Sequence, residues 1–165
     1  MRLRRRGLWL LAGLCVRVGG SAQAPVQPVQ WTVAITQKTA MKPGTSSVIE
    51  LSAEVEEGWH VYGLMQLPGG PTPLRVTLDT DEVAKIAGAP TGNPPVKKHD
   101  AAFDLDTDLY EKAFKLDLPI TFNPHLVEGG KAVPLSVRFQ ACNDRVCLPP
   151  RTLHLSVAIE ISPSK

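Results

Sequence analysis

Hydrophobic and polar residues alternate along most of the chain after residue 30, which is the pattern of half-buried β-strands. In residues 48–55, for example, Ile49 and Leu51 alternate with Glu50 and Ser52. The alternation predicts strands over residues 31–37, 48–55, 59–62, 74–78, 83–87, 110–122, 133–139 and 153–161. No helical period and no internal repeat is sustained. Because turn residues separate the segments, the sequence predicts an all-β, antiparallel β-sandwich of seven or eight strands.

One long segment, residues 89–108, breaks this pattern. It has no periodicity, it contains Gly92-Asn93-Pro94-Pro95, and its one aromatic residue is Phe103. Proline and glycine clusters of this kind mark turns and loops. We therefore expect a long loop here, and loops of this length inside a compact domain are usually functional or disordered.

The first 24 residues have the pattern of a secretory signal peptide. Arg2, Arg4, Arg5 and Arg6 precede an apolar run over residues 7–16, and Ser21-Ala22-Gln23-Ala24 ends in the small-residue pattern of a cleavage site. We expect cleavage after Ala24, which divides the chain into a signal peptide, 1–24, and a mature domain, 25–165. An uncleaved anchor is the alternative, although the apolar run is shorter than the about 20 residues that span a bilayer.

The charge of the chain changes once this segment is removed. The whole sequence of 165 residues has 18 basic and 16 acidic side chains. Residues 1–24 hold five of the arginines and no acidic residue, so the remainder has 13 basic and 16 acidic side chains and a formal charge of −3. Since nucleic-acid binding relies on basic surfaces, we expect no nucleic-acid partner.

Two cysteines, Cys142 and Cys147, remain in the mature domain. In an exported protein an even number of cysteines suggests a disulfide. A disulfide that closes so short a loop stabilises a fold by only about 2 kcal/mol in the chain-entropy model, so this bridge would contribute little to stability. A redox-active pair and a passive structural disulfide both stay open. CxxC, CxxCH and paired HxxxH motifs are missing from the sequence, so we expect no metal and no cofactor.

Three stretches, residues 58–71, 103–111 and 140–150, together resemble a known family. The most specific is the last, which reads QACNDRVCLPP and places two cysteines around a short polar insert before Pro-Pro. The first reads GWHVYGLMQLPGGP. In order and spacing they are similar to the N-terminal periplasmic domain of the thiol:disulfide interchange protein DsbD, and the resemblance spans nearly the whole mature chain.

The resemblance implies an immunoglobulin-like sandwich with the two cysteines as a redox pair on neighbouring strands. By analogy Cys147 exchanges with the partner, Cys142 resolves the mixed disulfide, and Phe103 is the aromatic of a cap loop over the pair. The implied function is a periplasmic thiol–disulfide exchange module, a component of protein-disulfide reduction. Its partners would be thioredoxin-like or disulfide-isomerase-like exported proteins, and a separate membrane protein would supply electrons. The alternative is a non-catalytic periplasmic β-sandwich binding module with a structural disulfide.

Four further residues are candidates for supporting roles. Arg145 could favour a thiolate and Asp144 would oppose it, although both are also typical of a solvated turn. Tyr62 is expected to pack on the cysteine hairpin or in the core, and Tyr110 lies in the second matching stretch.

The cap segment departs from the family pattern. Ala101 and Ala102 precede Phe103, so the nearest acidic residues, Asp100 and Asp104, stand away from the usual positions. The resemblance therefore leaves open whether a cap carboxylate tunes the pair. His60, between two strand residues, is interpreted as a surface or core histidine.

Overall fold

The computed structural model describes residues 26–36 and 41–163, so the predicted signal peptide lies outside the described residues. Twelve strands and no helix are found in these ranges. The strands are β1 (Val29–Ile35), β2 (Ser46–Val55), β3 (Trp59–Tyr62), β4 (Arg75–Leu78), β5 (Ala84–Ile86), β6 (Thr91–Gly92), β7 (Val96–Asp100), β8 (Leu105–Tyr110), β9 (Phe114–Phe122), β10 (Gly129–Phe139), β11 (Ala141–Asn143) and β12 (Arg151–Ile161). None of the described residues belongs to a helix long and apolar enough to cross a membrane.

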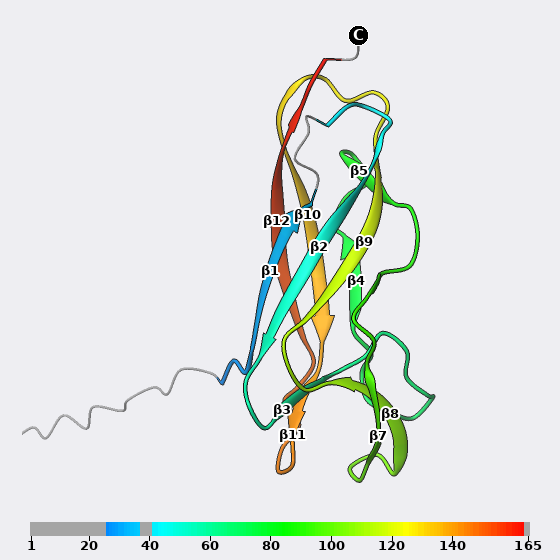
Figure 1. Ribbon diagram of the computed structural model, residues 1–165, viewed down its shortest axis with the longest axis vertical. Coiled ribbons are helices and arrows are strands. Elements are labelled where there is room, and N and C mark those ends of the chain that lie inside the picture. The colour runs from blue at the N-terminus through cyan, green and yellow to red at the C-terminus, as the bar shows by residue number, and fades with distance from the viewer. Residues whose placement is uncertain (1–25, 37–40, 164–165) are drawn as a thin grey trace, which may run out of the picture.

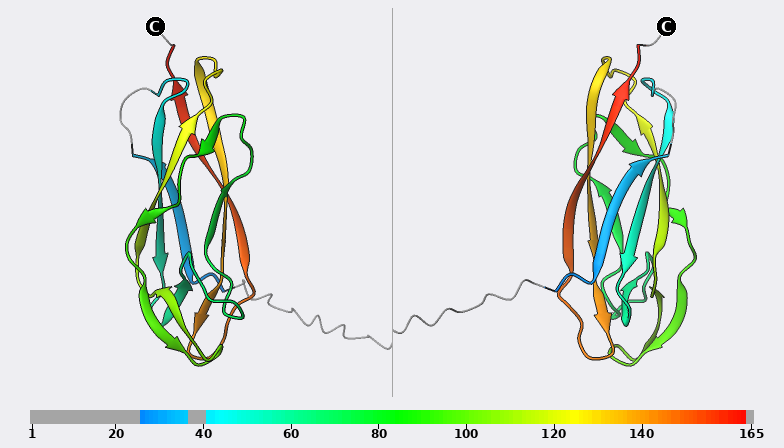
Figure 2. Two further views of the ribbon diagram at one scale, coloured as in Figure 1. Left: turned by 90° about the vertical axis from the view of Figure 1, so that its right-hand side faces the viewer. Right: turned by 60° about the vertical axis from the view of Figure 1, so that its left-hand side comes forward.

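Two antiparallel sheets form the layers of a sandwich (Figure 2). One has the order β1-β2-β9-β5, with β6 also paired to β9, and the other has the order β12-β10-β4. Ile49 of β2 and Leu118 of β9 are direct cross-strand partners and both are fully buried. Trp31 joins the two layers, because its ring contacts Phe114 of the first sheet and Phe139 of the second, each with centroids 5.5 Å apart. The prediction of an all-β, immunoglobulin-like antiparallel β-sandwich is confirmed.

A third, small sheet of four short strands, with the order β11-β3-β8-β7, lies at the end of the sandwich away from the C-terminus (Figure 1). The chain enters it through a turn at Gly58, whose φ of +79° is in the left-handed region that favours glycine. Strand β3 then pairs with β11 on one side and β8 on the other. This sheet carries both cysteine-bearing segments and the predicted cap.

The predicted loop over residues 89–108 is wrong, because most of it is strand. It contains β6, β7 and the start of β8, and β7 and β8 form an antiparallel hairpin. The pattern missed β7 because four of its five residues are exposed, so an edge strand held by backbone pairing has no apolar face to reveal it. The single strand predicted over residues 110–122 is divided between the end of β8 and β9.

Candidate functional site

The two cysteines form a disulfide across a tight hairpin, with their Cα atoms 4.1 Å apart. Cys142 lies in β11, and Cys147 pairs with it as an isolated antiparallel bridge. Asn143 shapes the turn between them: its Oδ1 accepts hydrogen bonds from the backbone N–H groups of Arg145 and Val146, both at 2.9 Å. This is the side-chain turn that asparagine favours, so the polar insert fixes the hairpin locally.

The two sulfurs differ in exposure. Cys142 is 1% exposed, whereas Cys147 is partly exposed. Both belong to a small apolar cluster that is separate from the main core and also contains Tyr62, Leu109 and Phe103. A thiol needs access to a partner sulfur in order to exchange, so Cys147 is the better placed of the two to meet a partner.

Tyr62 is the central residue of this cluster. The side chains of β3 alternate, so Val61 enters the main core while Tyr62 faces the disulfide. Its hydroxyl oxygen lies 4.0 Å from Cys147 Sγ and donates a hydrogen bond to Asp100 Oδ2 at 2.6 Å. Burial, reinforced by the bond to Asp100 and its negative charge, raises the pKa of Tyr62 well above its usual range. Tyr62 therefore stays neutral and donating at physiological pH.

The predicted cap residue lies in the turn of the β7–β8 hairpin. Phe103 lies in this turn, partly buried, and its ring stands perpendicular to Tyr62 with centroids 6.0 Å apart. The departure from the family pattern does not remove a carboxylate from this region, because Asp100 ends β7 beside Tyr62 and also accepts a hydrogen bond from the Ala102 N–H at 2.9 Å. The hairpin makes this possible, since it turns the end of β7 toward the pair although Asp100 is three residues from Phe103 in sequence.

The other candidate residues lie farther from the sulfur cluster. Tyr110 does not join it: its ring belongs to the main core and stacks on Phe114 with centroids 3.9 Å apart. The side chains of Asp144 and Arg145 are exposed in the hairpin turn, and neither forms an ion pair with any residue that the structure describes. Their geometry is that of a solvated turn.

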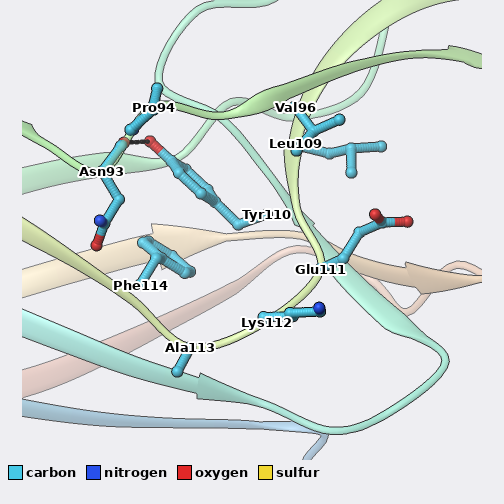
Figure 3. A pocket seen from close by; sticks show the side chains of 9 residues that line it. All are labelled: Asn93, Pro94, Val96, Leu109, Tyr110, Glu111, Lys112, Ala113 and Phe114. Carbon is cyan, nitrogen blue, oxygen red and sulfur yellow. Dashed lines mark hydrogen bonds between the residues drawn. The ribbon is translucent and has the colours of Figure 1, made fainter.

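Tyr110 instead lines a hollow of about 350 Å3 next to the site (Figure 3). Its hydroxyl donates a hydrogen bond to the Asn93 carbonyl at 3.2 Å, which ties the segment between β6 and β7 to β8. Leu109 and Glu111 line this hollow and also the cleft beside the disulfide. Tyr110 therefore supports the backbone that carries the cap rather than the sulfurs themselves.

His60 has a place at the site that sequence reasoning missed. It lies directly opposite Cys142 in the β3–β11 register and contacts the Tyr62 ring edge-on, with centroids 5.1 Å apart. Together with Asp100, Glu111 and Asp144 it lines a cleft of about 370 Å3. Burial lowers the pKa of His60, and these three carboxylates oppose that shift. The sequence does contain a signal for this position: His60 and Tyr62 are two residues apart in a predicted strand, so both side chains lie on one face of β3.

Residues 26–158 match the family described as thiol:disulfide interchange protein DsbD, N-terminal. The chain belongs to this family. No curated protein matches the chain in sequence.

The solved structures that match the chain include two at low sequence identity. One is the DsbD N-terminal domain of Neisseria meningitidis in its reduced form, at 15% identity and a TM-score of 0.49, covering 73% of this chain and 81% of that one. The other is AggA, the major subunit of aggregative adherence fimbriae type I from Escherichia coli, at 12% identity and a TM-score of 0.40, covering 85% of this chain and 99% of that one.

The contact between Phe103 and Tyr62 predicts that Phe103 shields the disulfide. In Phe103→Ala, a small thiol should reduce the Cys142–Cys147 bridge several-fold faster, because the turn then exposes the sulfurs. The free energy of unfolding should fall by less than the about 3–5 kcal/mol typical of a core phenylalanine, since Phe103 is only partly buried. Stopped-flow reduction and denaturant unfolding measure both quantities. An unchanged reduction rate would mean that Phe103 does not shield the bridge.

The hydrogen bond from Tyr62 to Asp100 predicts a pH-dependent stability. At about pH 8, Tyr62→Phe should lower the free energy of unfolding by about 1–2 kcal/mol, because a bond to a carboxylate is lost. The raised pKa of folded Tyr62 means that its contribution is complete below the unfolded pKa of about 10 and is lost as the pH rises above that value. The difference between the two proteins should therefore shrink above about pH 10 in denaturant titrations. A difference that is constant with pH would contradict this account.

Proposed function

We propose that the mature domain, residues 25–165, is a periplasmic thiol–disulfide exchange module that passes electrons through Cys142 and Cys147 to or from thioredoxin-like partners. The observation that carries the proposal is the unequal placement of the two sulfurs in one hairpin: Cys142 is 1% exposed, and Cys147 is partly exposed. Membership of the DsbD N-terminal family supports the same chemistry.

The exchange begins from the reduced pair. The Cys147 thiolate attacks one sulfur of the partner's disulfide, forms a mixed disulfide and releases the partner's other sulfur as a thiolate. Cys142, after losing its proton, then attacks Cys147 and re-forms the internal bridge. Two electrons have passed to the partner, which leaves as a dithiol. The reverse sequence would reduce the pair, and a separate membrane electron donor is proposed to drive it.

The position of Tyr62 supports this order of events. Its hydroxyl oxygen is 4.0 Å from Cys147 Sγ, and its one proton is donated to Asp100 while the bridge is intact. A rotation of this O–H from Asp100 to the sulfur would let Tyr62 donate to a Cys147 thiolate as that thiolate forms or leaves. Donation to the charged form stabilises a thiolate. Phe103 packs against the same cluster as Cys147, so we propose that its turn moves aside when a partner binds. Phe103 is thus proposed as a cap residue and Tyr62 as a supporting one.

The sulfur roles predict which variant traps a partner. Cys142→Ser, incubated in reduced form with an oxidised thioredoxin-like protein, should accumulate a covalent adduct through Cys147, because the resolving sulfur is gone. Cys147→Ser is the matched control and should trap much less, since Cys142 is buried. Non-reducing electrophoresis with mass spectrometry identifies the linked cysteine.

The alternative outcomes have separate meanings. Adducts formed mainly through Cys142 would reverse the two roles and keep the exchange function. No adduct from either variant would favour a binding module with a structural disulfide.

A further inference from the structure

The resolving step needs the Cys142 thiol to lose a proton, because the thiolate and not the thiol attacks a disulfide. Cys142 is 1% exposed, so bulk solvent has little access to that proton. Burial in an apolar cluster with Tyr62 and Leu109 also disfavours a free thiolate. A proton acceptor on the same face of the small sheet would remove both obstacles.

His60 occupies the position that such an acceptor requires. It is the direct cross-strand partner of Cys142, and side chains in that relation have Cβ atoms about 4.5–5.5 Å apart on one face. Its Nε2 is buried and has no hydrogen-bond partner among the described residues. A buried polar atom without a partner calls for an explanation. Reduction of the bridge would create a hydrogen-bond partner for Nε2, because it gives Cys142 an S–H group that can donate a hydrogen bond to a neutral imidazole nitrogen.

The other titratable groups around this face are already engaged or exposed. Asp100 accepts hydrogen bonds on both carboxylate oxygens, from Tyr62 and from the Ala102 N–H. Glu111 pairs with Lys98, and Asp144 is exposed in the hairpin turn. Tyr62 is itself a donor to Asp100 and lies against Cys147. His60 is therefore the one group here with a free nitrogen opposite Cys142.

We propose that His60 is the general base for the resolving cysteine. Resting on the exchange function proposed above, the step is as follows: His60 takes the proton of the Cys142 thiol, and the resulting thiolate attacks Cys147 in the mixed disulfide. The Cys142–Cys147 bond forms while the bond between Cys147 and the partner breaks. The partner sulfur leaves with the electron pair and then takes a proton from the imidazolium or from water.

The electrostatics of His60 suit this task. Burial lowers its pKa, so the ring is neutral and able to accept a proton near pH 7. Asp100, Glu111 and Asp144 act in the opposite direction and would stabilise the imidazolium once it forms, while Lys98 disfavours it.

The test isolates the resolving step with a chromogenic leaving group. Reduced protein is mixed with an aromatic nitrothiobenzoate disulfide, which loads Cys147, and the attack by Cys142 then releases a second coloured thiolate that is followed by stopped flow. This leaving group needs no proton, so the rate reports deprotonation and attack by Cys142. His60→Gln should slow the release about a hundredfold or more at about pH 7, from the lower end of the range of general-base catalysis upward. His99→Gln is the matched control, because His99 lines the same cleft but pairs with Asp104 and Asp106 on the cap hairpin.

The pH profile separates a base from a structural residue. In the unaltered protein the release rate should level off above the pKa of His60, whereas in His60→Gln it should keep rising about tenfold per pH unit toward the pKa of the thiol. Free imidazole should restore part of the rate to His60→Ala.

Three results would contradict either the role of His60 as a base or the exchange function itself. A His60→Gln variant with the rate and profile of the unaltered protein would overturn the role of His60. A slower variant with an unchanged profile and no rescue by imidazole would also overturn it, because that is the behaviour of a packing residue. Failure of the unaltered protein to release the second thiolate after Cys147 is loaded would instead count against the exchange function.

Discussion

The alternation of side chains along β3 is the constraint on which the site depends. Val61 is fully buried in the main core of the sandwich, and this fixes the strand at the end of the two large sheets. Because neighbouring side chains of a strand point to opposite faces, His60 and Tyr62 must then face the cysteine hairpin. A shift of one residue in the pairing of β3 with β11 would exchange the two faces and remove both rings from the disulfide. The stability of the core therefore holds the geometry of the site.

This arrangement gives the two sulfurs different surroundings within a single hairpin. Cys147 is partly exposed, next to the Tyr62 hydroxyl and in the same apolar cluster as Phe103, whereas Cys142 is buried opposite His60. A sulfur that meets a partner needs access and a donor for its thiolate, and a sulfur that resolves the intermediate needs shelter and a route for its proton. These requirements are the basis for the proposed roles of Cys147 with Tyr62 and of Cys142 with His60. Since the loop between the cysteines is so short, the disulfide itself adds little to the stability of a fold that already has an extensive core.

Strands that bury an apolar face could be predicted from the sequence. Strands that are exposed on both faces could not be predicted. Strands β2, β9 and β10 alternate clearly because every second residue enters the core, and β3 was predicted with its observed bounds. Strand β7 is exposed on nearly all positions, so its residues carry no periodic signal, and the cap was expected to be a loop. The hydrogen bond from Tyr62 to Asp100 could not be predicted for the same reason. It depends on where the β7–β8 hairpin turns, and the spacing between Asp100 and Phe103 in the sequence does not reveal that position. The family resemblance pointed to the cysteine motif and to Phe103, while the register that sets His60 against Cys142 needed the structure.

The reduction potential of the Cys142–Cys147 pair tests the central claim most directly. The protein would be equilibrated in redox buffers of stated potential, and its free thiols would be trapped by alkylation and counted by mass spectrometry. A pair that exchanges with thioredoxin-like partners should have a potential higher than about −300 mV, within reach of such partners. A potential below about −300 mV would be that of a structural disulfide and would contradict the account.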